Sequence, residues 1–356
     1  MSLEELRAKI DALDEQILTL LNERARCAVE IGAIKRSTDA AFYVPEREKA
    51  VFERLRKQNQ GPLPEQAVKA IYREVMSSIR ALEKKISVAF LGPRDTFSHM
   101  AAMRVFGVTA DYHPLATLSD IFTEVERKRI DYGVVPVESS MGGGVHDTLD
   151  RFVNSDLKIV NEVLLQITQN LLANCPMDQI KRVYSKDNAF VQCRNWLRAN
   201  LPNAELIDTS STAEAARIAH GEPGTAAIAS ALAAQTYNLE ILIARIEDSP
   251  NNYTRFFVVG HQLAKPTGKD KTSILISVKD RPGALYSLLL PFYENNVNLT
   301  RIESRPSRKK AWEYVFFIDM LGHVTEPAVT NVLEKVGEYC NEIKILGSYP
   351  QGEVEE

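Results

Sequence analysis

Two basic residues near the N-terminus are spaced so that they could hold one small anion together. Arg24 falls where the apolar seam of a long helix would take a hydrophobic residue, and Lys35 follows eleven residues later. Eleven residues make about three helical turns, so the two side chains lie on one face, within about 20° of each other. Two cations beside an apolar seam are costly unless an anion neutralises them.

Arg7 is placed differently along the same helix. It precedes Arg24 by 17 residues, which is about 26 Å along the axis and about 100° around it. It could serve the same small ligand only from a second chain whose helix runs antiparallel. The plain alternative for all three residues is a helical dimerisation hairpin with solvated charges.

Three stretches in the middle of the chain bring hydroxyls, glycines or charges to the ends of expected strands. Each could also be an ordinary turn or a surface strand end. Where glycines follow a strand, backbone amides can approach an anion closely. The stretches are FLGPRDTFSHMAA at 90–102, VVPVESSMGGGVHDTLD at 134–150 and NNYTRFFVVG at 251–260.

Pro282 and Gly283 stand at the start of an expected helix near the C-terminus. Free backbone amides there suit a carboxylate, although the feature could be only a capped helix. The chain has no GxxxxGK and no paired Rossmann signature, so nucleotide binding is not favoured.

The elements that position these residues fall into an all-helical part and an α/β part. Apolar residues at spacings of three and four predict helices over 3–36, 45–58 and 65–85. The first would be about 50 Å long, so it is expected to pack lengthwise against other helices or a second copy. From Ile86 to about Leu263, short strands alternate with helices.

A linker is predicted at 265–271, followed by a strand, a helix, two strands, a helix and a strand. The second of those paired strands is expected at 312–321. This βαββαβ order predicts a compact ferredoxin-like sandwich. The fold class is therefore multidomain, α followed by α/β.

Composition excludes several classes of protein. The 356 residues carry 43 Lys+Arg against 47 Asp+Glu, a net charge of −4 that argues against dominant nucleic-acid binding. The uncharged stretches are interrupted by polar residues, so no membrane span is expected. The N-terminus does not resemble a signal peptide, and the four cysteines form no CxxC pair. A cytoplasmic protein without a metal site is predicted.

The helical part, LRAKIDALDEQILTLLNERARCAVEIGAIK with PEREKAVFERL and REVMSSIRALE, closely resembles the all-helical chorismate mutase family over 3–85. That resemblance implies an intertwined dimer and a site in which arginines hold the substrate carboxylates. It also implies that Lys35 reaches the ether oxygen and that Glu48 contacts the ring hydroxyl. The matching charged positions are Arg7 (from the partner chain), Arg24, Lys35, Arg47 and Glu48.

Such a rearrangement needs only a clamp on the reactive conformer and cations where negative charge grows. Two positions depart from the family pattern: Val44 replaces an acidic residue, and Glu83 stands where Gln often donates to the ether oxygen. An ionised Glu cannot donate a hydrogen bond. We therefore expect Glu83 to act protonated.

The central stretches, with VYSKDNAFVQC and STAEAARIA, resemble the prephenate dehydratase catalytic domain over about 87–263. The resemblance implies two α/β lobes, like a periplasmic binding protein, with the active site in the cleft. It makes Thr254 the central catalytic residue. Arg255 is either a partner of a substrate carboxylate or a structural ion pair. The other implied cleft residues are Glu138, Ser139, Ser185 and Gln192.

In the reaction, prephenate loses carbon dioxide and water to give phenylpyruvate. It requires protonation of a leaving hydroxyl, for which hydroxyls and amides suffice. No cofactor is expected. The pairs Arg94-Asp95 and Lys186-Asp187 replace the family's usual Glu-Gly and His-Pro, so loop shape can differ there.

The C-terminal part, DRPGALY followed by NLTRIESRP, resembles the ACT regulatory domain over about 271–349. By resemblance, two motifs form a phenylalanine site at a dimer interface. Tyr286 follows the first motif where Val is usual. The implied effector-binding residues are Gly283, Ala284, Leu285, Glu303, Ser304, Arg305 and Pro306.

The order of the three parts predicts a bifunctional enzyme that converts chorismate to prephenate and then to phenylpyruvate, with inhibition by L-phenylalanine. A homodimer or larger homo-oligomer without nucleic-acid or membrane partners is expected. Domains are predicted at 1–85, 86–264 and 271–350. The alternatives are a non-catalytic sensor of aromatic acids or amino acids and a dehydratase that prefers arogenate.

Overall fold

The computed structural model describes residues 1–38, 40–278, 281–306 and 314–353. These residues form two compact units. One contains residues 1–87 with 106–111, and the other contains 88–105 with the rest of the chain. Within the described ranges, no helix combines the length and apolarity needed to cross a membrane.

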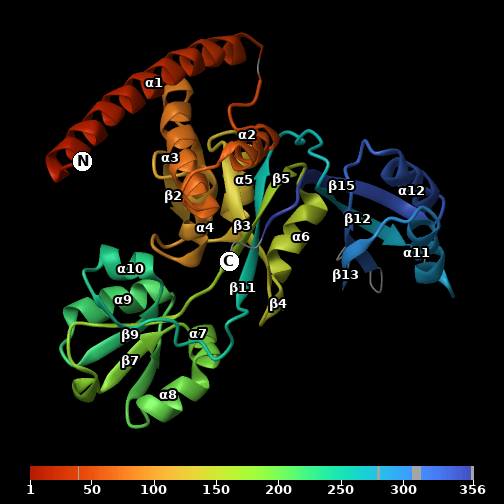
Figure 1. Ribbon diagram of the computed structural model, residues 1–356. Helices are drawn as coiled ribbons and strands as arrows, with labels where there is room; N and C mark the ends of the chain where they lie inside the picture. The colour runs from red at the N-terminus through yellow and green to blue at the C-terminus, as the bar shows by residue number, and fades with distance from the viewer. Residues whose placement is uncertain (39, 279–280, 307–313, 354–356) are drawn as a thin grey trace. The chain divides into compact units, whose positions relative to one another are not determined.

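The first unit is built on three helices (Figure 1): α1 (Leu3–Thr38), α2 (Pro45–Gln58) and α3 (Glu65–Glu83). Acidic residues in the first turn of α1 and basic residues in its last turn suit the helix dipole. Pro45 occupies the first position of α2, where its missing N–H costs nothing. At Gly32, an added Cβ would lie 3.0 Å from the Cβ of Glu83, so the glycine lets α1 and α3 approach closely.

Most apolar residues of α1 are not covered by the rest of the described chain. Only Ala28 and Gly32 of this helix are buried. The large apolar side chains left exposed on α1 are Leu3, Leu6, Ile10, Leu13, Ile17, Leu18, Leu20, Val29, Ile31 and Ile34. A face of this size is typical of a surface that packs against another chain.

The second unit begins with a mixed sheet in the order β2-β1-β3-β11-β5, with β4 paired to β3. Its strands are β1 (Ser87–Leu91), β2 (Asp111–Leu115), β3 (Tyr132–Ser139), β4 (Gly143–Gly144), β5 (Lys158–Gln166) and β11 (Tyr253–Gly260). Its helices are α4 (Phe97–Phe106), α5 (Leu118–Glu126) and α6 (His146–Asn154). Strand β11 runs antiparallel between β3 and β5, which places a late segment of the chain at the centre of this lobe.

A second sheet has the order β10-β6-β9-β7-β8 and forms the other lobe. Its strands are β6 (Asn170–Ala173), β7 (Arg182–Ser185), β8 (Glu205–Asp208), β9 (Thr225–Ala229) and β10 (Glu240–Ile243). Its helices are η1 (Met177–Gln179), α7 (Asp187–Gln192), α8 (Arg194–Asn200), α9 (Thr212–Gly221) and α10 (Ala231–Thr236). The chain crosses between the two sheets twice, after β5 and before β11, as expected for a two-lobed domain.

The third sheet is antiparallel, in the order β13-β14-β12-β15. Its elements are β12 (Asp270–Val278), α11 (Ala284–Glu294), β13 (Leu299–Pro306), β14 (Tyr314–Leu321), α12 (Pro327–Gly337) and β15 (Cys340–Pro350). Apolar side chains on one face, among them Ile274 and Ile318, pack with the two helices.

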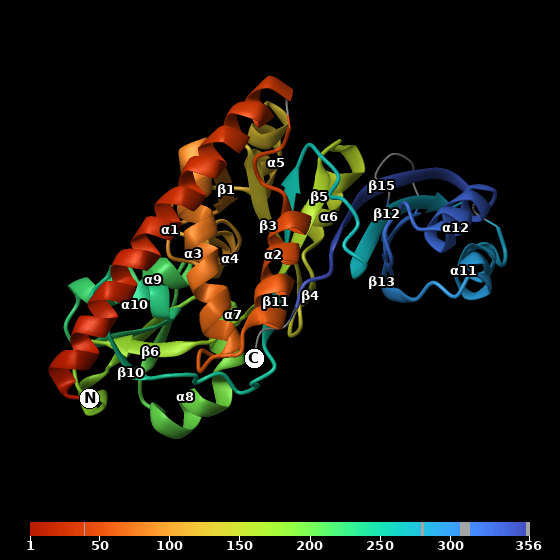
Figure 2. The same cartoon turned by 45° about the horizontal axis from the view of Figure 1, so that its top comes forward.

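The opposite face of the third sheet packs on the first lobe. Leu275, Phe317 and Tyr349 share one apolar cluster with Phe152 and Phe257. Strand β15 approaches β5 so closely that an added Cβ on Gly347 would lie 2.2 Å from the carbonyl oxygen of Ile159. Figure 2 shows β15 beside β5. The sheet is therefore sandwiched between its own helices and the first lobe.

The predicted fold class is confirmed, with small differences at element ends. The third helix ends at Glu83 rather than near Lys85. Lys271, predicted to end a linker, already belongs to β12, which starts at Asp270. Trp312 and Glu313, predicted to begin a strand, lie outside the described residues.

Candidate active sites

The predicted mutase residues Lys35 and Glu83 meet between α1 and α3. Lys35 Nζ lies 2.9 Å from Glu83 Oε2, and it also donates to the carbonyl oxygen of Phe42 at 3.3 Å. Arg36 donates to the backbone oxygen of Glu83. This contact uses one carboxyl oxygen of Glu83 as an acceptor. The predicted role of Glu83 requires a proton on the other oxygen, which could then donate to a substrate.

Glu48, on α2, forms a partly buried ion pair with Arg80 of α3. Burial raises the pKa of the Glu48 carboxyl, while Arg80, Arg73 and Lys35 oppose this rise. Because Lys35 acts on Glu48, the two predicted residues belong to one electrostatic cluster. Arg80 was not predicted; it is itself buried and also donates to the carbonyl oxygen of Phe106.

The predicted arginines of the mutase site are less closely gathered. Arg24 is half-buried on α1, whereas Arg47 is exposed on α2. Arg7 is exposed near the N-terminal end of α1. Its distance from Arg24 follows from the helix rise and is about 26 Å. A single chain therefore does not bring Arg7 to the Lys35–Glu83 pair.

In the first lobe, four predicted dehydratase residues lie side by side on neighbouring strands. Thr254 is the Cα partner of Ser139, and Arg255 is the partner of Glu138, where β11 pairs with β3. The loop after β3 is fastened to the start of β11: Ser140 Oγ donates to the carbonyl oxygen of Asn251 and accepts from the N–H of Tyr253. The register thus places Thr254 beside Ser139, the last residue of β3.

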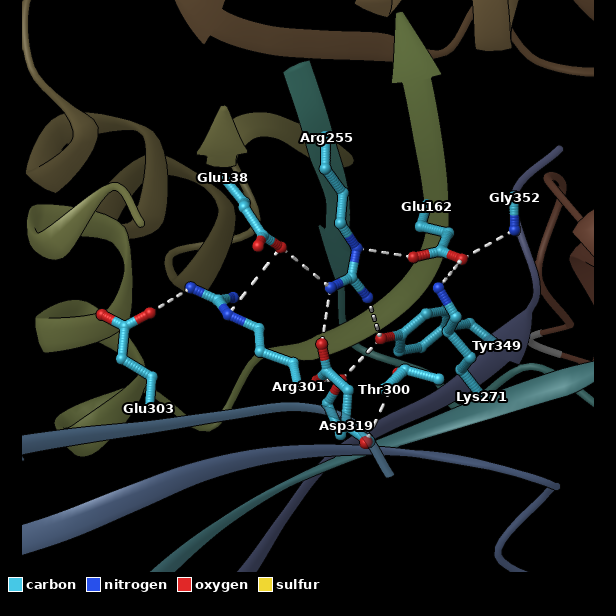
Figure 3. A network of polar contacts seen from close by, with 11 residues as sticks. Glu138, Glu162, Arg255, Lys271, Thr300, Arg301, Glu303, Asp319, Tyr349 and Gly352 are labelled. Atoms are coloured by element: carbon cyan, nitrogen blue, oxygen red, sulfur yellow. Dashed lines mark hydrogen bonds and ion pairs between the residues drawn. The ribbon is translucent and has the colours of Figure 1, made fainter. Parts of the chain in front are cut away.

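Arg255 is held in a buried network, shown in Figure 3. Its Nε donates to Glu162 at 2.7 Å, its Nη1 to Asp319 at 2.5 Å, and its Nη2 to the Tyr349 hydroxyl at 3.1 Å. Burial alone would lower the pKa of the Arg255 guanidinium, but Tyr349, Asp319 and Glu162 outweigh this effect, so its pKa is raised. Of the two predicted roles for Arg255, this geometry favours the structural ion pair.

The remaining predicted dehydratase residues lie on the second lobe. Ser185, at the end of β7, is fully buried and donates to the carbonyl oxygen of Ile228 at 2.7 Å. Gln192, at the end of α7, accepts from Gln169 at 2.9 Å. Both residues belong to the second lobe, whereas Thr254 lies on a strand of the first.

The stretch after β1 carries a buried histidine. His99 stacks on Phe90, and its Nδ1 accepts from the N–H of Asp95. Burial lowers the pKa of His99 below its usual value, so the neutral ring is favoured although Asp95 opposes this effect. The backbone oxygen of Asp95 accepts from Ser230 of the second lobe, so this turn also joins the two lobes.

The predicted effector motifs occupy the start of α11 and the end of β13. Gly283 caps α11 with a left-handed φ of 77°, which suits glycine, and Ala284 and Leu285 begin the helix. Along β13, Glu303 and Arg305 are half-buried, while Ser304 and Pro306 are exposed. The two charged residues contact the first lobe. Arg305 donates to Asp150 at 3.2 Å, and Glu303 lies 3.8 Å from the ring nitrogen of His146.

Comparison with known proteins shows the family of this chain. Family models match residues 6–84 (chorismate mutase type II), 88–264 (prephenate dehydratase) and 272–338 (ACT domain). A protein of Aquifex aeolicus named bifunctional chorismate mutase/prephenate dehydratase is 50% identical over 99% of both chains. The chain belongs to this bifunctional family. A relative of the same name from Stutzerimonas stutzeri is 47% identical over 98% of both chains.

A solved structure agrees with the dehydratase and ACT parts. The prephenate dehydratase of Arthrobacter aurescens, solved in complex with L-Phe, has a TM-score of 0.70 and 35% identity, covering 75% of this chain and 90% of its own. The dehydratase and ACT parts of this chain are therefore similar in fold to a solved prephenate dehydratase.

Several residues around the family's dehydratase site were missed by sequence reasoning. Asn252 is almost fully buried, and neither amide atom has a partner among the described residues. It lies one position before the start of β11 and belongs to the stretch NNYTRFFVVG, which is the signal that the sequence offered. No sequence signal pointed to Glu162, Asp319 or Tyr349, because they are far from Arg255 in the sequence.

Proposed function

We propose that the helical unit rearranges chorismate to prephenate and that the two-lobed domain converts prephenate to phenylpyruvate, carbon dioxide and water. We also propose that L-phenylalanine inhibits through the C-terminal domain. The observation that carries the proposal is that relatives named for both activities match the chain from end to end at up to 50% identity. The proposed division of labour follows the domains predicted at 1–85, 86–264 and 271–350.

In the proposed mutase step, the protein supplies a clamp and positive charge. Chorismate is a dicarboxylate, and guanidinium groups pair with carboxylates through two parallel hydrogen bonds. Arg24 and Arg47 provide this in one chain, while Lys35 leaves Glu83 for the ether oxygen, where negative charge grows in the transition state. Glu48, held by Arg80, is left to meet the ring hydroxyl.

We propose that the site is completed by Arg7 of a second copy. The exposed apolar face of α1 supports a homodimer, because burial of that face would be favourable by about 25 cal/mol per Å². Helices that run antiparallel in such a dimer bring the N-terminal part of one α1 to the middle of the other. We also propose a cytoplasmic location, for which the dispersed free cysteines are suitable.

In the proposed dehydratase step, the bond between the ring and its carboxylate breaks, and its electron pair enters the ring. The ring hydroxyl leaves with one added proton as water, and the ring becomes aromatic. Thr254, between Ser139 and Leu165 on neighbouring strands, relays that proton or orients the leaving group. Glu138, Ser139, Ser185 and Gln192 are proposed to line the substrate.

The function is tested by incubating the purified chain with chorismate near neutral pH and following prephenate and phenylpyruvate by chromatography. We expect phenylpyruvate to form far above a control without enzyme. Chorismate that persists at the control rate would remove the mutase proposal. Prephenate that accumulates without phenylpyruvate would remove the dehydratase proposal and favour the predicted sensor. A parallel assay with arogenate tests the predicted alternative substrate.

Glu83 gives the mutase a predicted pH dependence. If Glu83 must be protonated to donate a hydrogen bond to the substrate, mutase activity falls as the pH rises. Glu83→Gln donates through its amide at any pH, so we expect its profile to be flatter than the parent's on the alkaline side. The measurement is the mutase kcat/KM from pH 5 to 9. Glu65→Gln, at an exposed site on α3, is the control, and identical profiles for Glu83→Gln and the parent would refute the role.

A further inference from the structure

Three charged residues of β13 point toward the first lobe. Burial alternates along this strand, and Arg301, Glu303 and Arg305 are on its covered side. Arg301 is the Cα partner of Asp319, and Glu303 is the partner of Phe317, whose ring belongs to the apolar cluster shared with the first lobe. The effector motif is thus continuous with the surface that touches the catalytic lobe.

Arg301 stands between two carboxylates that belong to different functional parts. Its Nη2 donates to Glu303 of the effector motif at 2.5 Å, and its Nε lies 3.8 Å from Glu138 of the catalytic strand β3. Figure 3 shows its guanidinium between the two side chains. The Arg301 side chain is only 9% exposed, so this charge is shielded from water more than either partner.

Glu138 is held from two sides. Arg255 Nη1 lies 3.7 Å from its Oε2, nearly the same distance as Arg301. Arg255 is fixed by Glu162 and by Asp319. These two ion pairs fix the Arg255 side chain. Movement of Arg301 would therefore reposition Glu138, whose side chain is 41% exposed.

The glycine-rich turn lies against the same pair. An added Cβ on Gly144 would be 2.5 Å from Glu303 Oε2 and 2.9 Å from Arg301 Nη2. Gly144 pairs with Glu138 across β3 and β4. The third glycine of this turn is therefore explained by the approach of the Arg301–Glu303 pair, and anion binding is not needed to account for it.

We propose that Arg301 is a positioning residue of the dehydratase site and the point at which effector binding reaches it. This rests on the proposed function. Arg301 is shared between Glu303 and Glu138. A ligand group that engages Glu303, such as the ammonium of an amino acid, withdraws that carboxylate from Arg301. The guanidinium then turns to Glu138, draws it from the substrate, and dehydratase activity falls.

The coupling is reciprocal, because the same guanidinium cannot satisfy both carboxylates fully. A substrate that needs Glu138 in place favours the Arg301–Glu303 pair and so weakens effector binding by the same factor. Such coupling free energies correspond typically to a factor of about 5 to 150 in affinity. Arg301 touches neither ligand in this scheme, so its effect is on coupling and positioning.

The test compares Arg301→Gln, Arg301→Lys and the control Lys335→Gln in the full chain. Lys335 forms an exposed ion pair with Glu294 between the two C-terminal helices. For each variant, kcat and KM for prephenate are measured with and without saturating phenylalanine. Phenylalanine binding is measured by calorimetry, and mutase activity reports whether the chain is intact.

We expect Arg301→Gln to bind phenylalanine at least as tightly as the parent, because the competitor for Glu303 is removed, but to lose the effect of phenylalanine on kcat/KM. Arg301→Lys is expected to keep part of the coupling, because an ammonium keeps the charge without the planar fork. Lys335→Gln should respond as the parent does. Inhibition of Arg301→Gln equal to that of the parent would overturn the proposal.

Glu303→Gln provides a second measurement if Arg301→Gln fails to fold. The neutral amide releases Arg301 to Glu138, so we expect a reduced dehydratase rate without phenylalanine and an unchanged mutase rate. Full dehydratase activity in this variant would count against the scheme. A parent chain that does not turn over prephenate overturns the proposed function as well, whereas an active parent insensitive to phenylalanine overturns only the coupling.

Discussion

Replacing Thr254 with Val should reduce the dehydratase kcat/KM by about 100-fold or more, because a positioned proton-transferring group contributes about 10²–10⁴ in rate. Valine keeps the shape of threonine and favours a strand, so β11 and its pairing with β3 and β5 should persist. The mutase activity of the same chain should not change. The measurement is the rate of phenylpyruvate formation from supplied prephenate.

Thr330→Val is the matched control for this experiment. Thr330 is exposed on α12, and its hydroxyl donates only to backbone oxygens of that region. We expect its dehydratase rate to stay near that of the parent. A Thr254→Val enzyme that keeps more than about a tenth of the parental kcat/KM would show that the hydroxyl neither donates nor relays the proton.

The elements of this chain were largely predictable because their signals are local. Apolar spacing of three and four marks α1 to α3, and Pro45 marks the start of α2. The alternation of short apolar strands with helices predicted the α/β part. The exact ends were less predictable, as at Asp270, because β12 gains its first residues by pairing with β14 and β15, which are far away in sequence.

The partners of the predicted catalytic residues could not be predicted in the same way. The motif that contains Thr254 and Arg255 is visible in the sequence, but the residues that bind Arg255 are not. Glu162 and Asp319 are separated from it by 93 and 64 positions. Neither belongs to a recognisable motif, and their role follows only from packing of the third sheet on the first lobe. The sequence therefore left the role of Arg255 open.

The contact between Lys35 and Glu83 was also not predictable from the sequence. Lys35 and Glu83 were each predicted to act on the substrate, because each was matched to a family position separately. The structure pairs them with each other across 48 positions. Each residue neutralises the charge of the other at a partly buried position, so neither is left there without a counterion.

Replacing Lys35 with Gln should reduce the mutase kcat/KM by about 10²–10³, the range observed when one donor to a developing negative charge is removed. The dehydratase rate with supplied prephenate should be unchanged. Lys57→Gln, at the exposed end of α2, is the control. The measurement is the rate of chorismate disappearance at neutral pH.

The same change also leaves Glu83 without its partner, and the Glu83 side chain is only 10% exposed. The amide of Lys35→Gln can still donate to Glu83 but does not neutralise its charge. A poorly exposed charge without its counterion costs at least about 1–3 kcal/mol, so this variant should unfold at a lower temperature. The double variant Lys35→Gln/Glu83→Gln separates the two effects. We expect it to recover most of the lost stability, because two amides can pair, but not the lost mutase rate, because no cation remains for the ether oxygen. Recovery of both would mean that Lys35 only supports the fold, and that the charge on the ether oxygen is stabilised elsewhere.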